Sequence, residues 1–200
     1  MTLRTSYTFI APVYDLLVRR FSQDLRKRSL QRLGDIAGQS ILLPGIGTGL
    51  DIPHLPQGAR YTGMDLTPAM LKRAESQIPA GMNMALQTGD AMAMPFDDHQ
   101  FDCVVMHLIL AVVPEPQKAL AEAARVVKPG GRILILDKFL KPNETAWFKR
   151  AISPLMGRIA TRTDVVFEEL LATLPQLALQ HNDSAGLAGW FRYIELNKAN

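Results

Sequence analysis

The chain has 200 residues, of which 48% are hydrophobic and 20% charged, a composition typical of one folded globular domain. Its single cysteine, Cys103, excludes an intramolecular disulfide and a metal cluster built from cysteines. No apolar stretch approaches the roughly 18 residues of a membrane-spanning helix, and no secretory signal is evident. We therefore expect a cytoplasmic protein, either free or attached peripherally to the inner face of a membrane.

The net charge of +3 is unevenly distributed along the chain. Residues 1–33 carry seven Arg or Lys and two Asp, a net charge of +5, whereas the remaining residues carry a net charge of −2. Apolar residues recur in this first segment at three- and four-residue steps, which predicts a basic amphipathic helical segment that Pro12 interrupts. One interpretation is an ordinary helix that packs on the domain. The other is a helix on an anionic membrane surface, with five basic residues on lipid phosphates: Arg19, Arg20, Arg26, Lys27 and Arg28.

Strands and helices alternate after this segment. Apolar runs predict strands at about residues 40–44, 60–65, 82–88, 101–107 and 133–136. Helices are predicted just after Gly49, from Thr67 and Pro68 onward, and over 116–127, 142–157 and 167–174. Residues 177–180 and 190–196 predict two strands with no helix between them, which are typical of an antiparallel pair. The predicted fold is an α/β, doubly wound, mostly parallel seven-stranded sheet with an antiparallel C-terminal edge pair, in one domain over residues 1–200.

A glycine cluster follows the first predicted strand. Gly45, Gly47 and Gly49 have the spacing G-x-G-x-G, and Asp65 ends the second strand 20 positions after Gly45. Glycines here let the backbone approach a ligand closely, and a carboxylate at the next strand tip accepts both hydroxyls of a ribose. The dinucleotide pattern G-x-G-x-x-G and the P-loop are both absent, so no diphosphate cradle is expected. The glycines alone also fit a plain turn, but together with Asp65 they favour a nucleoside without phosphates, such as S-adenosylmethionine.

Other polar residues follow the remaining predicted strands, where ligands bind in open α/β sheets. Asp90 is placed to accept a hydrogen bond from an adenine amine, with Met64, Leu66 and Met92 either covering the ring or filling the core. His107 either orients or deprotonates a substrate group or closes its strand through hydrogen bonds. Asp137 and Lys138 follow the fifth strand. The four histidines (His54, His99, His107, His181) have no ligand spacing, so no metal site is expected.

Five segments resemble, in order, the motifs of class I S-adenosylmethionine-dependent methyltransferases. They are ILLPGIGTG at 41–49, GMDLTPAML at 63–71, GDA at 89–91, FDCVV at 101–105 and RVVKPGGR at 125–132. More narrowly, Tyr7 with APVYD at 11–15, VVPEP at 112–116 and ISPLM at 152–156 resemble bacterial phospholipid (phosphatidylethanolamine) N-methyltransferases. Ubiquinone and menaquinone C-methyltransferases share the segment Ala-Pro-x-Tyr-Asp. The chain departs from the family at Leu43 and Pro44, because the family usually has an acidic residue two positions before the first glycine.

The resemblance implies S-adenosylmethionine as the cofactor and assigns residues to it. The glycine loop would contact the methionine part, Asp65 the ribose and Asp90 the adenine, while an aromatic N-terminal segment closes over the site. From the resemblance and the strand positions together, the predicted catalytic residues are His107 and Tyr14. The predicted cofactor-binding residues are Tyr7, Tyr14, Gly45, Gly47, Gly49, Asp65, Leu66, Met70, Asp90, Ala91 and His107.

The implied activity is N-methylation of an aminophospholipid head group, phosphatidylethanolamine and its methylated forms. Residues 1–33 would then dock on an anionic membrane surface and cover the site. One alternative is C- or O-methylation of a quinone precursor or another small molecule, and another is a catalytically silent S-adenosylmethionine-binding protein. A nucleic-acid partner is not expected, because the basic charge is confined to one end of the chain and no nucleic-acid methyltransferase tetrapeptide is present.

Overall fold

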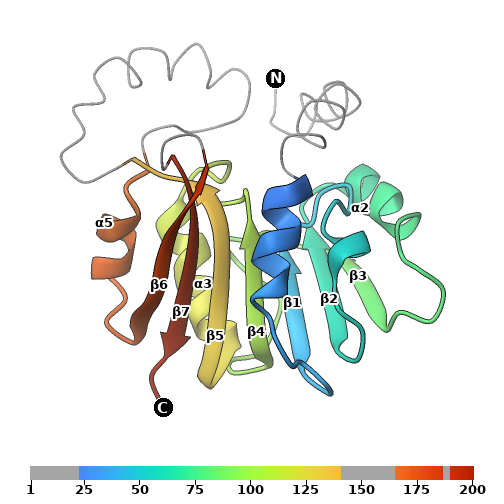
Figure 1. Cartoon of the computed structure of the whole chain (residues 1–200), viewed down its shortest axis with the longest axis horizontal. Helices are drawn as coiled ribbons and strands as arrows, with labels where there is room; N and C mark the ends of the chain where they lie inside the picture. The colour runs from blue at the N-terminus through green and yellow to red at the C-terminus, as the bar shows by residue number, and fades with distance from the viewer. Residues whose placement is uncertain (1–22, 141–164, 187–189) are drawn as a thin grey trace, which may run out of the picture.

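A seven-stranded sheet with helices on both faces forms the framework of the protein (Figure 1). The computed structural model describes residues 23–140, 165–186 and 190–200. The strands are β1 Ser40–Pro44, β2 Arg60–Asp65, β3 Met84–Thr88, β4 Phe101–His107, β5 Val127–Lys138, β6 Leu177–Gly186 and β7 Phe191–Lys198. The helices are residues 23–31, η1 Ile52–His54, α2 Pro68–Glu75, α3 Pro116–Val126 and α5 Phe167–Ala172.

The strand order confirms the predicted doubly wound sheet. The order is β3-β2-β1-β4-β5-β7-β6. The first five of these strands pair in parallel, whereas β7 pairs antiparallel with both β5 and β6. The chain order reverses between β1 and β4, so the carboxyl ends of these strands border a crevice where α/β proteins bind ligands.

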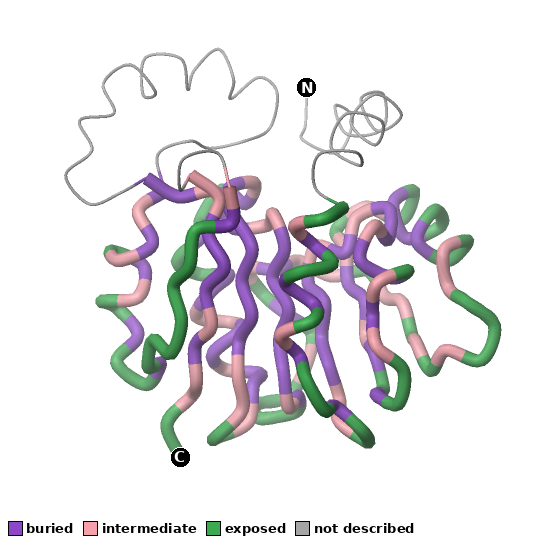
Figure 2. Tube along the Cα trace, viewed as in Figure 1, coloured by how far each residue is buried: buried purple, intermediate pink, exposed green. Residues whose placement is uncertain are grey.

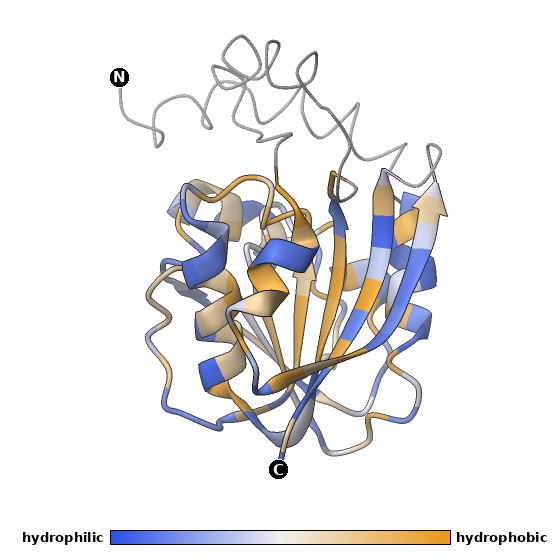
Figure 3. Cartoon of the chain, turned by 90° about the vertical axis from the view of Figure 1, so that its left-hand side faces the viewer, coloured by the Kyte–Doolittle hydropathy of each residue, from blue (hydrophilic) through white to orange (hydrophobic). Residues whose placement is uncertain are grey.

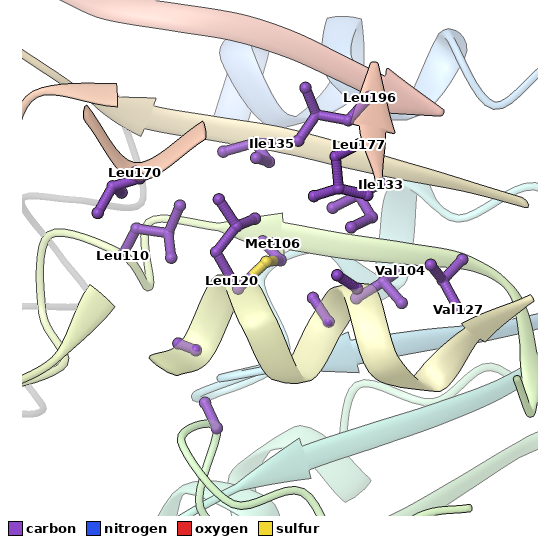
Figure 4. Packing of buried hydrophobic residues seen from close by; sticks show 14 of the residues in the cluster. Val104, Met106, Leu110, Leu120, Val127, Ile133, Ile135, Leu170, Leu177 and Leu196 are labelled. Atoms are coloured by element: carbon purple, nitrogen blue, oxygen red, sulfur yellow. The ribbon is translucent and has the colours of Figure 1, made fainter. Parts of the chain in front are cut away.

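Two apolar layers cover the two faces of the sheet. On one face, Val104 and Met106 of β4 pack with Leu120 of α3 and with α5 (Figure 4). On the other face, the alternate residues Cys103 and Val105 pack with the helix at 23–31 and with α2. Figures 2 and 3 show that the buried and hydrophobic residues follow the central strands. The continuous apolar runs of these strands reflect burial on both faces.

Two strands extend beyond their predicted limits. β5 begins at Val127 instead of residue 133, because Val127 pairs with Phe101 before the register shifts at Cys103. The segment Lys128–Gly131, which lies between the predicted helix and the predicted strand, is therefore an irregular start of the strand. β6 continues to Gly186 although its residues from 178 to 184 are exposed. Pairing of its backbone with β7 maintains the strand where the sequence has no apolar alternation.

The helix at residues 23–31 presents a mixed polar and apolar stripe to the sheet. Arg26, Ser29 and Leu30 are buried at the spacing of one helical face, and Leu33, just after the helix, is buried as well. Arg132 of β5 donates hydrogen bonds to the carbonyl oxygens of residues 32 and 33, which lie at the C-terminal end of this helix. The rest of the predicted N-terminal segment, residues 1–22, and the predicted helix at 142–157 lie outside the described residues. None of the described helices is long and apolar enough to cross a membrane.

We expect Gly49→Ala to lower the free energy of unfolding by about 2 kcal/mol. Gly49 has φ +83°, and an added Cβ would lie 2.9 Å from the Cα of Ala74 in α2, which is backbone and has little freedom to move. The substitution therefore adds a strained conformation and a steric clash. Gly34→Ala is the matched control, since Gly34 has φ +62° but no atom within 4 Å of the added Cβ. Equal destabilisation of the two variants in urea unfolding would show that the contact with α2 is unimportant.

Candidate functional site

A pocket lies at the carboxyl ends of β1 to β4, where the strand order predicts a ligand. Its lining residues come from the loops after these four strands, from α2 and from the helix at 23–31. Several of them are sequence-predicted site residues: Gly45, Gly47, Asp65, Leu66, Met70, Asp90, Ala91 and His107. Residues from separate parts of the chain therefore meet in one concave site.

Asp65 connects the glycine loop to α2. Its Oδ2 accepts a hydrogen bond from the N–H of Gly47 at 2.9 Å, and its Oδ1 accepts one from the N–H of Thr67 at 2.9 Å. Each carboxylate oxygen has a second lone pair, so both can still accept hydroxyl groups from the pocket. Burial raises the pKa of Asp65, and the two backbone N–H groups partly oppose that increase. Thr67 is the N-cap residue of α2, although its side chain makes no capping hydrogen bond.

The acidic residue after β3 is similarly fixed by backbone. Asp90 Oδ1 accepts a hydrogen bond from the N–H of Met92 at 2.8 Å. Leu66 and Met92 line the pocket beside it, and Leu66 is unusually exposed for a leucine, at 49%. A planar base between these side chains would cover that apolar surface. Met64 was also predicted either to cover the adenine ring or to fill the core. It is fully buried in the core.

The loop after β4 forms an apolar wall that the sequence analysis did not identify. Leu108, Ile109, Val112, Val113 and Pro114 all line the pocket. Leu108 has φ +56°, a left-handed conformation that is uncommon for leucine and sets the direction of the loop. Ile109 lies directly over Gly45, where a Cβ at position 45 would collide with its side chain. The first glycine is therefore required for the close approach of this wall.

His107 takes part in a buried hydrogen-bond network. Its Nδ1 lies 2.8 Å from Asp51 Oδ1, and its Nε2 lies 2.9 Å from Ser29 Oγ. An ionised carboxylate only accepts hydrogen bonds, so Nδ1 donates to Asp51 and, in the neutral imidazole, Nε2 accepts from Ser29. The lone pair of the ring is thus directed at Ser29 and not at the pocket. This arrangement favours an orienting role for His107, and its proposed catalytic role stays a prediction.

Arg26 belongs to the same network, and its expected place on a lipid surface is wrong. Its guanidinium donates from Nη1 to Asp51 Oδ2 at 2.6 Å, and only 8% of its side chain is exposed. The helical face that carries Arg26 turns toward the sheet, so Arg26 lines the pocket instead. Burial alone would raise the pKa of Asp51, but the adjacent Arg26 and His107 outweigh it and hold this pKa well below its usual range.

Asp137, which follows the fifth strand, is fully buried and does not line the pocket. Its two oxygens accept hydrogen bonds from the N–H groups of Ala111, at 3.2 Å, and Lys138, at 2.8 Å. Through the hydrogen bond to Ala111, the carboxyl group helps to hold the apolar loop after β4 in place. Burial raises its pKa to about 6, although the backbone N–H groups act in the opposite direction.

We expect this pKa to make stability decrease by roughly 2–3 kcal/mol as the pH rises from about 4 to about 7. Over this range the unfolded chain ionises Asp137 freely, whereas the folded protein must ionise it inside the core. At lower pH both states are protonated and the penalty disappears. Urea unfolding of Asp137→Asn should lack this component, while the exposed variant Asp97→Asn should retain it. If Asp137→Asn retains the full pH dependence, another group is responsible.

Not every predicted site residue lines the pocket. Gly49 does not line the pocket. It lies against Ala74 of α2, where a side chain at position 49 would collide with the helix. Tyr7 and Tyr14 lie outside the described residues. Arg26 and the apolar wall line the pocket although they were not predicted as pocket residues from the sequence. The apolar run at 108–113 directly after a strand was the available signal for the wall, whereas nothing local distinguishes Arg26 from its basic neighbours.

Comparison with known proteins identifies the family. Residues 42–135 match a methyltransferase domain family. A phosphatidylethanolamine N-methyltransferase of Cereibacter sphaeroides is 27% identical over 190 residues and covers 93% of both chains. A demethylmenaquinone methyltransferase of Tropheryma whipplei is 31% identical over 184 residues, which are 86% of this chain and 75% of that one. This chain belongs to the class I S-adenosylmethionine-dependent methyltransferases.

A solved structure supports the fold of this methyltransferase. A chain of the solved complex between the Haloferax volcanii Trm112 methyltransferase activator and the putative methyltransferase superposes with a TM-score of 0.81. It is 17% identical, and the match covers 100% of both chains. At this identity the likeness concerns the seven-stranded fold alone.

The residues of the methyltransferase pocket fit its cofactor, S-adenosylmethionine. The cofactor contains an adenosine without phosphates, and the pocket has carboxylates at the tips of β2 and β3. Asp65 would hold the ribose and Asp90 the adenine amine, with Leu66 and Met92 against the base. The glycine loop, with Gly45 at φ +69° and Gly47 at φ +57°, leaves the main chain accessible to the ligand. Leu43, which replaces the acidic residue usual in the family, is buried and does not line the pocket.

Proposed function

We propose that this methyltransferase methylates the amine of an aminophospholipid head group, with phosphatidylethanolamine as the first acceptor. The observation that carries the proposal is the end-to-end match with the phosphatidylethanolamine N-methyltransferase, which covers 93% of each chain. The pocket supports it, because the wall from Leu108 to Pro114 offers an apolar surface to the hydrophobic part of a lipid.

The contribution of the chain to the reaction is binding, orientation and exclusion of water. S-adenosylmethionine supplies a methyl group on a positively charged sulfur, which is activated toward an amine. Asp65 and Asp90 would hold the adenosine at one side, and the apolar loop would cover the other side, where an amine would approach. Fixing the two reactants in line removes much of the entropic cost of their encounter. The network around His107 holds the end of β4 in place beneath this region.

A quinone precursor is the second candidate acceptor. It is favoured by the higher identity to the demethylmenaquinone methyltransferase, 31% compared with 27%, although that match covers less of the relative. A quinol is also an amphipathic molecule with a long apolar part, so the apolar wall alone does not separate the candidates.

Methyl transfer from labelled S-adenosylmethionine distinguishes these acceptors. The purified full chain is incubated with mixed micelles containing phosphatidylethanolamine or demethylmenaquinol, and the products are separated. We expect labelled monomethylated phosphatidylethanolamine. Labelled menaquinol alone would contradict the proposal and support the second candidate. S-adenosylhomocysteine binding without turnover on either lipid would support a silent binding protein.

We also propose that residues 1–33 bring the enzyme to an anionic membrane surface. In the described part of this segment, Lys27 and Arg28 are exposed, while Arg26 is committed to the pocket. The exposed cations should attract anionic lipid, and salt should weaken that attraction. Sedimentation with vesicles should therefore depend on anionic lipid and decrease with salt. Equal sedimentation with neutral vesicles would argue against an electrostatic contribution.

A further inference from the structure

Leu108, the first residue after β4, has a backbone conformation that leucine rarely adopts. Its φ of +56° lies in the left-handed region, where a Cβ comes close to the following carbonyl oxygen. Glycine has no Cβ and adopts this conformation freely, and asparagine tolerates it better than leucine does. In the described part of the chain, His99 is the other non-glycine residue with a positive φ, at +60°. Leucine at position 108 therefore has a conformational cost that glycine would not have.

The surrounding structure imposes this conformation from both sides. The N–H of Leu108 donates to the carbonyl oxygen of Leu136 in β5 at 2.8 Å, one residue beyond the end of β4. Two residues later Leu110 is fully buried, and the N–H of Ala111 donates to Asp137 Oδ2 at 3.2 Å. The chain must turn between these two anchors, and Leu108 makes the turn. Backbone strain that is enforced in this way is often found at functional sites.

Packing in the core does not account for the leucine side chain. Leu108 is partly exposed and belongs to none of the three apolar clusters that the described residues form. Its neighbours differ, because Leu110 is a member of one cluster and Ile109 packs against it. Leu108 lines the pocket instead. Contact with a ligand would give this side chain a favourable interaction that offsets the conformational cost, and glycine could not make that contact.

The position of Leu108 along the sheet indicates which part of the reaction it serves. Asp65 and Asp90, the predicted adenosine ligands, follow β2 and β3, whereas Leu108 follows β4 at the other end of the pocket. We propose that Leu108 determines acceptor specificity by contacting the acyl-bearing part of the aminophospholipid. The inference rests on the proposed function and narrows it, because the enzyme would prefer a lipid to a water-soluble compound with the same head group.

Two acceptors with the same head group test this proposal. Dihexanoylphosphatidylethanolamine, used below its critical micelle concentration, has acyl chains, and glycerophosphoethanolamine has none. Leu108→Gly and Leu108→Asn suit the left-handed backbone but remove the apolar side chain. Both variants should lose about 10-fold in kcat/KM for the acylated acceptor and less than about twofold for the other. Leu108→Met keeps an apolar side chain of similar volume and should retain the selectivity of the wild type.

Two further measurements separate this effect from a general loss of structure. Calorimetry should give affinities for S-adenosylhomocysteine within about twofold of the wild type in all three variants. Melting temperatures should change by less than about 4 °C, because glycine and asparagine relieve the strain and no core contact among the described residues is lost. His99→Gly is the matched control, since it replaces the left-handed residue that precedes β4, at the opposite edge of the sheet. It should leave kcat/KM for both acceptors unchanged.

The possible results have different meanings. An equal loss on both acceptors, or a Leu108→Met variant as impaired as Leu108→Gly, would show that Leu108 only shapes the loop and would overturn the proposal. A similar loss of affinity for S-adenosylhomocysteine would assign Leu108 to the cofactor and also overturn it. Should the variants unfold, the wild type decides: kcat/KM values for the two acceptors within about twofold would contradict the proposed preference. Failure of the proposed function is a separate result that removes this inference with it, because the wild type would then methylate neither acceptor.

Discussion

Asp65→Ala should weaken the binding of S-adenosylhomocysteine by about 3–4 kcal/mol, a several-hundredfold increase in Kd. We predict that the carboxylate accepts both ribose hydroxyls, and charge-assisted hydrogen bonds contribute roughly 1.5–3 kcal/mol each. The substitution also removes the acceptor for the N–H groups of Gly47 and Thr67, so the glycine loop loses its connection to α2. Titration calorimetry at pH 7.5 measures the change.

Asp102→Asn is a matched control for this measurement. Asp102 also accepts a backbone N–H from a neighbouring strand, that of Ser40, at 2.8 Å, but it lies at the opposite edge of the sheet. This variant should lose some stability and keep its affinity for the nucleoside. Burial raises the pKa of Asp65, so this carboxylate becomes protonated at a higher pH than an ordinary aspartate as the solution is acidified. The affinity of the wild type for S-adenosylhomocysteine should therefore begin to fall at that higher pH. Unchanged affinity in Asp65→Ala would place the nucleoside elsewhere.

The central strands were predictable because each combines a short apolar run with a polar or glycine boundary. The bounds expected for β1, β2 and β4 agree with Ser40–Pro44, Arg60–Asp65 and Phe101–His107. β6 was predicted too short because its later residues, such as His181 and Asp183, are polar and exposed. Hydrogen bonds to β7 define this strand, and pairing between distant segments leaves no local periodic signal.

The candidate site was predictable where topology alone determines position. Asp65 and Asp90 follow parallel strands, whose carboxyl ends meet at one edge of the sheet, so both line the pocket. One of the two interpretations of the N-terminal segment placed Arg26 on lipid phosphates together with its basic neighbours Lys27 and Arg28, but only those two neighbours are exposed. The actual place of Arg26 depends on which face of the helix packs on the sheet. The wall after His107 depends likewise on the left-handed conformation of Leu108, which no residue-type preference predicts.

Asp51→Ala should be the most destabilising of the substitutions considered, with a loss of about 3–5 kcal/mol in the free energy of unfolding. Asp51 is the shared acceptor for Arg26 and His107, and all three side chains are buried. Removing the carboxylate leaves a buried guanidinium without a counter-ion and a ring N–H without an acceptor. Neither group can be rehydrated without opening the contact between the helix at 23–31 and the sheet.

Asp183→Ala is the control for this prediction, because it breaks an ion pair of similar length that is formed by Arg32, the residue just after the same helix. Arg32 and Asp183 are 2.7 Å apart, compared with 2.6 Å for Arg26 and Asp51, but their side chains are 30% and 52% exposed. An exposed pair contributes about 0–1 kcal/mol, so Asp183→Ala should change stability little. Similar losses in the two variants would mean that burial does not strengthen the Asp51 pair.

The pH dependence of the difference between wild type and Asp51→Ala provides a second test. The pKa of Asp51 is lowered in the folded protein, so the folded state holds the ionised form more strongly than the unfolded chain does. The stabilisation is therefore fully present above the ordinary aspartate pKa of about 4 and is lost progressively as the pH falls below it. Urea unfolding should give a smaller difference in solutions more acidic than about pH 4 than in neutral solution. A difference that persists unchanged below about pH 3 would indicate that packing of the side chain, and not its charge, joins the helix to the pocket.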